Sequence, residues 1–148
     1  MKKFSEGMVG FYAPEGEITK KLPVFYNPLM QFDRDLTIAI AKELGGEIYC
    51  DGLAGSGIRG MRAAKEAGFK EVYINDNSPE AVSLIERNLG CNKIEAKVSC
   101  EDVNSFLRRF KCNKLDVIDL DPFGSFIVVL DSAIRGVSRS GGLLCLTA

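Results

Sequence analysis

The chain has 148 residues, 46% of them hydrophobic and 26% charged, and its formal net charge is −1. Its length suits a single globular domain. The near-neutral charge gives no overall attraction to nucleic acid or to an anionic membrane. The sequence has no histidine and no C-x-x-C pair, which excludes His-dependent nucleophiles and argues against a metal site. We therefore expect no metal, no membrane segment and a reducing, cytoplasmic setting.

Strand-like and helix-like segments alternate along the chain. Apolar residues from Leu36 to Leu44 recur at helical spacing, and Gly45-Gly46 ends that predicted helix. The predicted strands are EIYCD (47–51), EVYIND (71–76), AKVSC (96–100), LDVIDLD (115–121) and LLCLTA (143–148). The other predicted helices cover 57–67, the segment after the Ser78-Pro79 cap with Ala81, Leu84, Ile85 and Leu89 on its apolar face, a short stretch around Phe106, and 126–136 with Ile127, Leu130 and Ile134 on its apolar face. This alternation predicts a parallel, doubly wound α/β sheet in one domain, with 1–32 as an N-terminal segment and 33–148 as the cofactor-binding core.

The stretch DGLAGSGIRG (51–60) contains the G-x-G-x-x-G spacing of a dinucleotide-binding loop. In an NAD site the strand stays apolar almost to the first glycine, so Asp51 would be buried there without a partner, at a cost of several kcal/mol. Ending the strand at Asp51 removes this conflict and leaves a longer loop built on Gly52, Gly55 and Gly57. Such a loop suits a ligand that carries an amine and a sulfonium, and we favour S-adenosyl-L-methionine over NAD.

Four aspartates stand at the carboxyl ends of predicted strands, where the ligands of parallel sheets bind. They are Asp51, Asp76, Asp102 and Asp121. Each alone could be a turn or helix-capping residue, but four on one edge favour a ligand site. Asp76 could accept hydrogen bonds from ribose hydroxyls, and Asp102 from an adenine amino group.

The segment DLDPFGS (119–125) indicates the chemistry of that site. An exocyclic amine is a poor nucleophile because its lone pair is delocalised into the ring. A carboxylate and a carbonyl that accept its two N–H bonds would localise the pair and stabilise the developing positive charge. Asp121 and the Pro122 carbonyl could do this, while Phe123 could stack on the base. The plainer alternative is a capped strand-to-helix turn with an aromatic residue in the core.

Four blocks, VFYNPLMQFDRDLTIAI, DGLAGSGIRGMRAAKE, NDNSPEAV and DVIDLDPFGS with the following LDSAIR and GGLLCLTA, resemble the tRNA guanine N2-dimethyltransferase family, which modifies guanine 26 of tRNA. The resemblance implies a class I (Rossmann-like) methyltransferase fold, S-adenosyl-L-methionine as cofactor and tRNA as partner. It also implies that Arg34 clamps the methionine carboxylate and that Phe25 faces Phe123 across the target base, with Asp121 as the catalytic carboxylate. Asp33, Gly55 and Phe126 depart from the family pattern, at positions that affect loop shape more than chemistry.

The family continues beyond the length of this chain, with more sheet and a C-terminal domain. We therefore expect an incomplete methyltransferase domain that stops after its fifth strand. The outer edge of that strand should favour self-association or a partner chain, and the chain alone should not methylate tRNA. Two alternatives remain at this point: a non-catalytic nucleotide-binding module that acts with a partner chain, and an NAD-binding oxidoreductase, which leaves the DPFG segment unexplained.

Overall fold

The computed structural model describes residues 1–15, 24–110 and 114–147. Its main sheet has five parallel strands in the order β5-β4-β3-β6-β7. These strands are β3 (Ile48–Asp51), β4 (Glu71–Asp76), β5 (Lys97–Cys100), β6 (Val117–Leu120) and β7 (Leu143–Leu146). The chain therefore builds outward from β3 to one edge and then crosses back to build outward to the other. This reversal between β3 and β6 creates the crevice in which such folds bind ligands.

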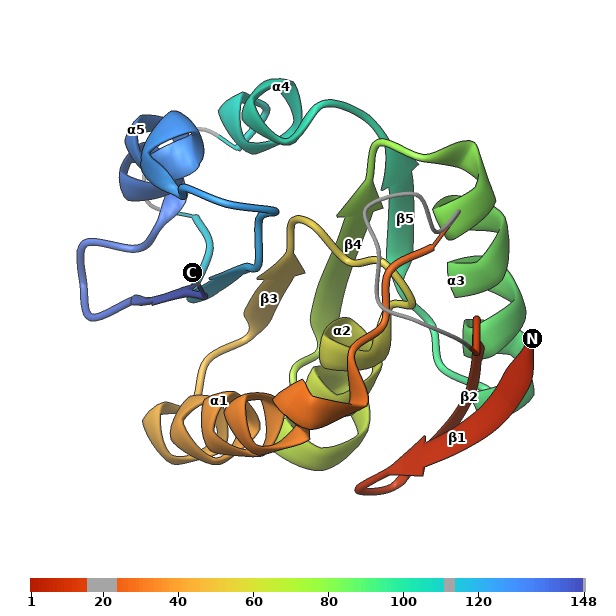
Figure 1. Cartoon of the computed structure of the whole chain (residues 1–148). Helices are drawn as coiled ribbons and strands as arrows, with labels where there is room; N and C mark the ends of the chain where they lie inside the picture. Colours follow the sequence, from red (N-terminus) through yellow and green to blue (C-terminus); the bar gives the residue numbers. More distant parts are fainter. Residues whose placement is uncertain (16–23, 111–113, 148) are drawn as a thin grey trace.

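A separate antiparallel hairpin, which was not among the predicted elements, precedes the sheet. It consists of β1 (Lys2–Glu6) and β2 (Val9–Ala13). Every second residue of β2 is buried, and β2 packs against helix α3. Residues 2–13 of the expected N-terminal segment therefore form a hairpin that packs beside α3 (Figure 1).

Helices cover both faces of the sheet (Figure 1). The helical elements are η1 (Pro28–Met30), α1 (Gln31–Leu44), α2 (Ile58–Arg62), the π-helical turn η2 (Ala63–Ala67), α3 (Pro79–Asn92), α4 (Val103–Arg108) and α5 (Ile127–Gly136). One core lies between the sheet and the layer formed by α1, α2, α3 and the hairpin. The second core lies between the opposite sheet face and helices α4 and α5. Consecutive strand residues such as Tyr49 and Cys50 alternate between the two cores, as the pleat requires.

The parallel α/β fold, all five predicted main-sheet strands and the predicted helices are confirmed. Ala148 of the last predicted strand lies outside the described residues. The predicted apolar face of α5 is wrong, because Ile127 and Ile134 are exposed while Val129, Ser132, Ala133 and Gly136 are buried. Within the described ranges, no helix combines the length and apolar character needed to cross a membrane.

Candidate active site

The glycine loop joins β3 to α2 and packs tightly against neighbouring backbone and side chains. A Cβ atom on Gly52 would lie 2.5 Å from the Leu120 side chain. Gly55 has a φ of +52°, and a Cβ atom there would lie 2.6 Å from the carbonyl oxygen of Phe25. Gly57 takes the left-handed conformation at the N-terminus of α2. Close approach at Gly52 and Gly55, rather than loop mobility, thus explains why side chains are absent there.

Asp76 fixes this loop from the end of β4. Its Oδ2 atom accepts a hydrogen bond from the Gly55 N–H at 2.8 Å, and its Oδ1 atom accepts one from the Ser78 N–H at 3.0 Å. The Ser78 side chain in turn caps α3 by accepting a hydrogen bond from Ala81 N–H. The carboxylate predicted to meet a ribose is therefore held in place by backbone on both sides.

Asn75, one residue earlier, ties three strand ends together. It is fully buried, and its Nδ2 atom donates to the carbonyl oxygens of Gly52 at 3.1 Å and Glu101 at 3.0 Å. Its Oδ1 atom accepts hydrogen bonds from Ser99 Oγ and Glu101 N–H. A buried amide with all these partners stiffens the edge on which the site stands. Asn75 was not predicted, because its partners Gly52, Ser99 and Glu101 are distant in the sequence.

Asp51 occupies a different position from the one expected. It belongs to β3, it is 2% exposed, and it lies beneath the loop rather than on the cavity wall. Its Oδ2 atom accepts a hydrogen bond from Gly60 N–H at 3.0 Å, so the premise that a carboxylate there would lack a partner is wrong. Burial first, and the neighbouring Asp119 carboxylate second, raise the pKa of Asp51 to about 8.

Arg59 places a buried cation beside two aspartates of the β6 segment, Asp119 and Asp121. Its Nη2 atom lies 3.1 Å from Asp121 Oδ2, and its Nη1 atom lies 3.3 Å from Asp119 Oδ2. The Asp119 oxygen also accepts a hydrogen bond from the Tyr49 hydroxyl at 2.8 Å. Burial raises the pKa of Asp119, while Arg59 and Tyr49 oppose that shift. Neither Arg59 nor Asp119 was a candidate from the sequence, because a helical arginine and a strand aspartate have no local signature of pairing.

Arg34 was expected to hold a ligand carboxylate, and in the structure it holds the carboxylate of Glu6. Its Nε and Nη2 atoms donate to the two Glu6 oxygens at 2.8 and 2.6 Å, and Nη2 also donates to the Asn27 carbonyl at 3.0 Å. Tyr26 donates its hydroxyl hydrogen bond to the same glutamate. Glu6 was missed because it comes from the unpredicted hairpin. The Nη1 atom of Arg34 takes part in none of these bonds, and Arg34 lines the cavity described next.

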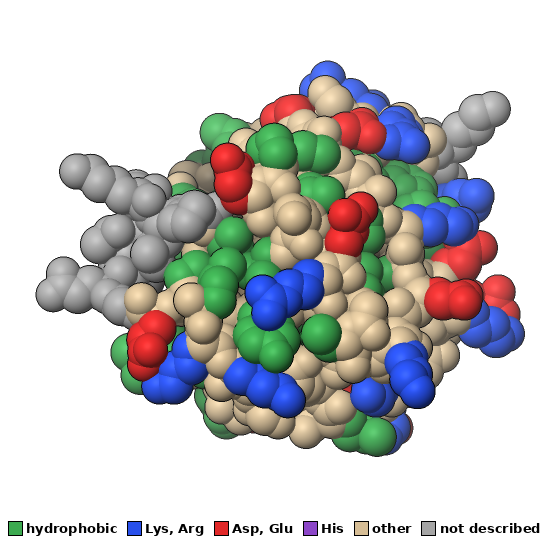
Figure 2. All heavy atoms as spheres, turned by 90° about the vertical axis from the view of Figure 1, so that its right-hand side faces the viewer, with side chains coloured by type: hydrophobic (Ala, Val, Ile, Leu, Met, Phe, Trp, Pro, Cys, Tyr) green, Lys and Arg blue, Asp and Glu red, His purple; other side chains and the backbone are tan. Residues whose placement is uncertain are grey.

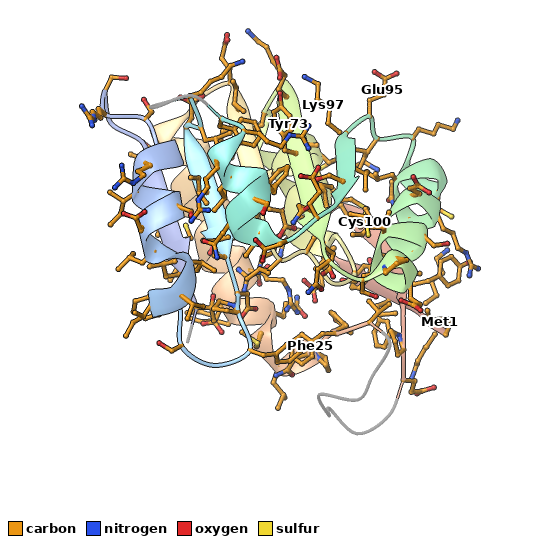
Figure 3. All side chains as sticks on the ribbon, turned by 90° about the horizontal axis from the view of Figure 1, so that it is seen from above. Met1, Phe25, Tyr73, Glu95, Lys97 and Cys100 are labelled. Carbon is orange, nitrogen blue, oxygen red and sulfur yellow. The ribbon has the colours of Figure 1, made fainter. Side chains whose placement is uncertain are left out.

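A cavity of about 230 Å³ opens at the carboxyl ends of β3, β4 and β6. Six of the predicted site residues line it: Phe25, Arg34, Gly55, Asp76, Asp121 and Phe123. A larger hollow of about 460 Å³ lies between β5 and α4, beside Tyr73 and Lys97. Phe25 lies on the side of the molecule opposite those two residues (Figure 3). The smaller cavity is the candidate site, because it is the one at the strand ends.

The two aromatic residues predicted to enclose a base lie at the cavity mouth. The Phe25 and Phe123 rings are in direct contact, with centroids 4.5 Å apart and planes at 80°. Phe123 is 57% exposed, so the alternative of a core aromatic at this position is wrong. Because the rings touch edge to face, a base bound between them would have to separate them.

The remaining predicted residues do not line the cavity. Asp102 is the N-cap of α4, and its Oδ1 atom accepts a hydrogen bond from Ser105 N–H at 3.0 Å. Gly52, Gly57 and Pro122 shape the loops on either side of the cavity without lining it. A capping role was the plainer interpretation of Asp102, and the structure bears out that geometry.

A parallel sheet of this strand order, with a glycine loop after β3, an acid after β4 and an Asp-Pro-Phe-Gly loop after β6, defines a class I, Rossmann-like methyltransferase fold. Two solved structures show the likeness. Trm1 from Pyrococcus horikoshii in complex with S-adenosyl-L-methionine has a TM-score of 0.88 and 31% identity, over 97% of this chain and 42% of that one. Trm5b from Pyrococcus abyssi shares the fold with a TM-score of 0.75 at 20% identity, over 95% of this chain and 38% of that one.

Residues 6–148 match the family model of the N2,N2-dimethylguanosine tRNA methyltransferases, and the chain belongs to this family. It is 42% identical to tRNA (guanine(26)-N(2))-dimethyltransferase from Methanococcus maripaludis, over 100% of this chain and 42% of that protein. It is 43% identical to the Pyrobaculum islandicum protein of the same name, over 97% of this chain and 42% of that protein. The chain thus spans about two fifths of the length of these relatives.

Proposed function

We propose that the cavity binds S-adenosyl-L-methionine and that this chain supplies the cofactor-binding and catalytic residues for methylation of N2 of guanine 26 in tRNA. The observation that carries the proposal is the meeting of Asp76 and Gly55, on the cofactor side, with Asp121 and Phe123 in one cavity. Family membership and the names of the relatives support the same substrate. They disfavour both the NAD-dependent oxidoreductase and the non-catalytic module.

The residues around the cavity suit the proposed cofactor. A carboxylate offers about four acceptor sites, so Asp76 can bind ribose hydroxyls while it keeps its bonds to Gly55 and Ser78. The Nη1 edge of Arg34 is the group that would meet the methionine carboxylate. Asp51 and Asp102 would support the site without touching the cofactor. Asp51 holds the Gly60 N–H, and Asp102 caps α4.

Asp121 and the Pro122 carbonyl would act on the target amine. When bound, the cofactor supplies a methyl group whose bond to sulfur breaks as the amine nitrogen forms its new bond. Asp121 would accept a hydrogen bond from one N–H of the amine and the Pro122 carbonyl from the other, which localises the lone pair and stabilises the positive charge that develops on nitrogen. The methylated nitrogen then loses one proton, which the Asp121 carboxylate can accept, and S-adenosylhomocysteine leaves. Phe25 and Phe123 would part to receive the base and hold it by stacking.

Calorimetry with S-adenosylhomocysteine and, separately, with NADH tests the cofactor. We expect binding of the former only. Asp76→Ala should weaken it by about 1.5–3 kcal/mol, the usual range for a hydrogen bond to a charged group. Asp131→Ala, which removes an exposed carboxylate on α5, is the matched control and should leave the affinity unchanged. Equal binding of NADH, or an unaffected Asp76→Ala variant, would contradict the proposal.

We also propose that another polypeptide surface, either a second copy or a partner chain, covers the β7 side of the molecule. In the described residues β7 pairs only with β6, so one edge of it offers free backbone groups. Helix α5 lies on one face beside β7, where Leu144 and Leu146 pack into the core that α5 shares. Helix α1 lies on the other face, where Thr37 forms a hydrogen bond with Cys145. Both helices carry large exposed apolar residues: Leu36, Ile40 and Leu44 on α1, and Ile127, Val128 and Ile134 on α5. Large exposed apolar residues on both sides of an open strand edge are typical of an interface.

tRNA methylation should depend on that covering surface. Phosphate contacts need clustered Lys and Arg, whereas the formal net charge of the chain is −1. On the one face shown in Figure 2, basic side chains lie among acidic and hydrophobic ones. We therefore expect the 148-residue chain alone to bind cofactor but not to methylate tRNA, in the cytoplasm where that substrate is found. Label transfer from S-adenosyl-L-methionine to tRNA guanine by a monomeric preparation would contradict this.

A further inference from the structure

Arg59 is a buried guanidinium that links the two sides of the cavity. It lies two residues beyond Gly57, in the first turn of α2, and its side chain is 6% exposed. The Nη2 atom donates to Asp121 Oδ2 at 3.1 Å and to Thr147 Oγ1 at 3.4 Å, and the Nη1 atom donates to Asp119 Oδ2 at 3.3 Å. The Arg59 side chain therefore connects the helix that follows the glycine loop with the loop that carries Asp121, the proposed catalytic carboxylate.

The surroundings of Arg59 fix its position. A buried guanidinium is stable only when its charge is paired, and here Asp119 supplies the anchor from within β6. Asp119 is fully enclosed, and its Oδ1 atom has no hydrogen-bond partner among the described residues. Within the described part of the chain, Arg59 pairs with the Asp119 carboxylate at Oδ2, where the Tyr49 hydroxyl also donates a hydrogen bond. If Arg59 turned toward solvent, the buried Asp119 carboxylate would lose the positive charge that pairs with it.

This anchored cation constrains one oxygen of the catalytic carboxylate and leaves the other for a ligand. The contact between Arg59 and Asp121 uses the Oδ2 atom. Of the two carboxylates that pair with Arg59, Asp121 is the partly exposed one, with 19% of its side chain accessible. Asp121 and Arg59 both line the cavity. With Oδ2 held, rotation of the carboxylate is restricted and Oδ1 has a defined direction. The helical turn that carries Arg59 directly follows the glycine loop, with Gly57 as its N-cap.

We propose that Arg59 is a positioning residue for the methyl transfer: it fixes the Asp121 carboxylate relative to the glycine loop, beside which the cofactor binds. This inference rests on the proposed function, in which Asp121 accepts the target amine. Its effect should appear in kcat rather than in cofactor affinity, because misplacing a reacting group by about 1 Å can cost about 100-fold in rate.

Arg59→Lys is the variant of choice, since it keeps a buried positive charge but cannot fork between two carboxylates. In the form that methylates tRNA, whether the chain alone or the chain with the surface that covers β7, we expect kcat to fall by about 10- to 100-fold. The dissociation constant for S-adenosylhomocysteine should change less than about twofold. Asp121→Asn should lower kcat at least as much, and the double variant should be no slower than Asp121→Asn.

Arg62→Lys is the matched control. Arg62 is as buried as Arg59 and lies one turn further along, but its hydrogen bonds go to Asp35 and Glu66. Whatever its own effect on kcat, that effect should multiply with the effect of Asp121→Asn. Multiplying effects of Arg59→Lys and Asp121→Asn would overturn the positioning role and show that Arg59 acts only on the fold.

The contact between Arg59 and Asp121 can be tested in the isolated chain by thermal unfolding of four proteins: the native protein, Arg59→Lys, Asp121→Asn and the double variant of these two. The shift in Tm caused by Arg59→Lys should be smaller in the Asp121→Asn background than in the native one. Additive shifts would overturn the inference even if no form of the protein methylated tRNA. A failure of the proposed function looks different: Asp121→Asn would then keep its kcat, or S-adenosylhomocysteine would not bind.

Discussion

The two halves of the sheet differ in how completely they are covered. On the β3-β4-β5 side, all four apolar residues predicted for α3 are buried against the sheet and the hairpin: Ala81, Leu84, Ile85 and Leu89. On the β6-β7 side, the apolar stripe that predicted α1 points away from the core, and Leu36, Ile40 and Leu44 are 50%, 42% and 57% exposed. An apolar stripe thus predicts that a helix forms, but the face it buries depends on which surfaces are present to cover it.

The largest expected difference between the halves is in core stability. Ile85 is fully buried, so Ile85→Ala should lower the free energy of unfolding by about 2–5 kcal/mol. The matched change in the open half, Ile40→Ala, should alter it by no more than about 0.5 kcal/mol. Urea unfolding of both variants measures this. Similar losses would mean that the α1 stripe is already covered in solution.

A second effect arises where the halves meet, at Asp51 in β3 and its register partner Asp119 in β6. The pKa of Asp51 rises from 3.8 to about 8 in the folded protein. The folded state holds the Asp51 proton more tightly than the unfolded state does. The contribution of this proton to the free energy of unfolding is therefore complete below a pH of about 4 and is lost as the pH rises to about 8. Urea unfolding between pH 5 and 8 should show this decline, and Asp51→Asn should flatten it. Asp131→Asn, at an exposed site, should leave the decline as it is; an unchanged slope in Asp51→Asn would refute the assignment.

Helix capping gives a smaller difference. The Ser78 side chain accepts a hydrogen bond from Ala81 N–H at 3.2 Å at the start of α3, whereas Met30 at the start of α1 provides no side-chain cap. Ser78→Ala should therefore cost about 0.5–2 kcal/mol in the free energy of unfolding. Met30→Ala should cost less, by the same measurement. The reverse order would show that α1 is held more tightly than its exposed face suggests.

The smallest effect on stability, with the clearest effect on association, is expected for Ile40→Glu. A charge on the exposed α1 stripe should leave the free energy of unfolding within about 0.5 kcal/mol and should weaken any self-association that uses this surface. Light scattering over a range of concentrations measures the mass. Lys42→Glu, a charge change at a polar position of the same helix, is the control. A dimer that persists unchanged in Ile40→Glu would place its interface elsewhere.

The amino-acid sequence was enough to locate the elements of the main sheet and much of the site. Local periodicity identified the five strands of the main sheet, although not the two strands of the hairpin. The carboxyl ends of parallel strands meet at one edge, so Gly55, Asp76, Asp121 and Phe123 could be assigned to one cavity in advance. The resemblance to a family added Phe25 and Arg34, which line the same cavity.

Only the tertiary structure revealed the residues that hold this site in place. Arg59, Asn75 and Glu6 act through partners far away in the chain, such as Asp121, Glu101 and Arg34. A charged or amide side chain in a helix or strand has the same local pattern whether it faces water or a buried partner. Its role is decided by which distant segments pack around it, because burial is what makes an unpaired polar group costly and a paired one rigid.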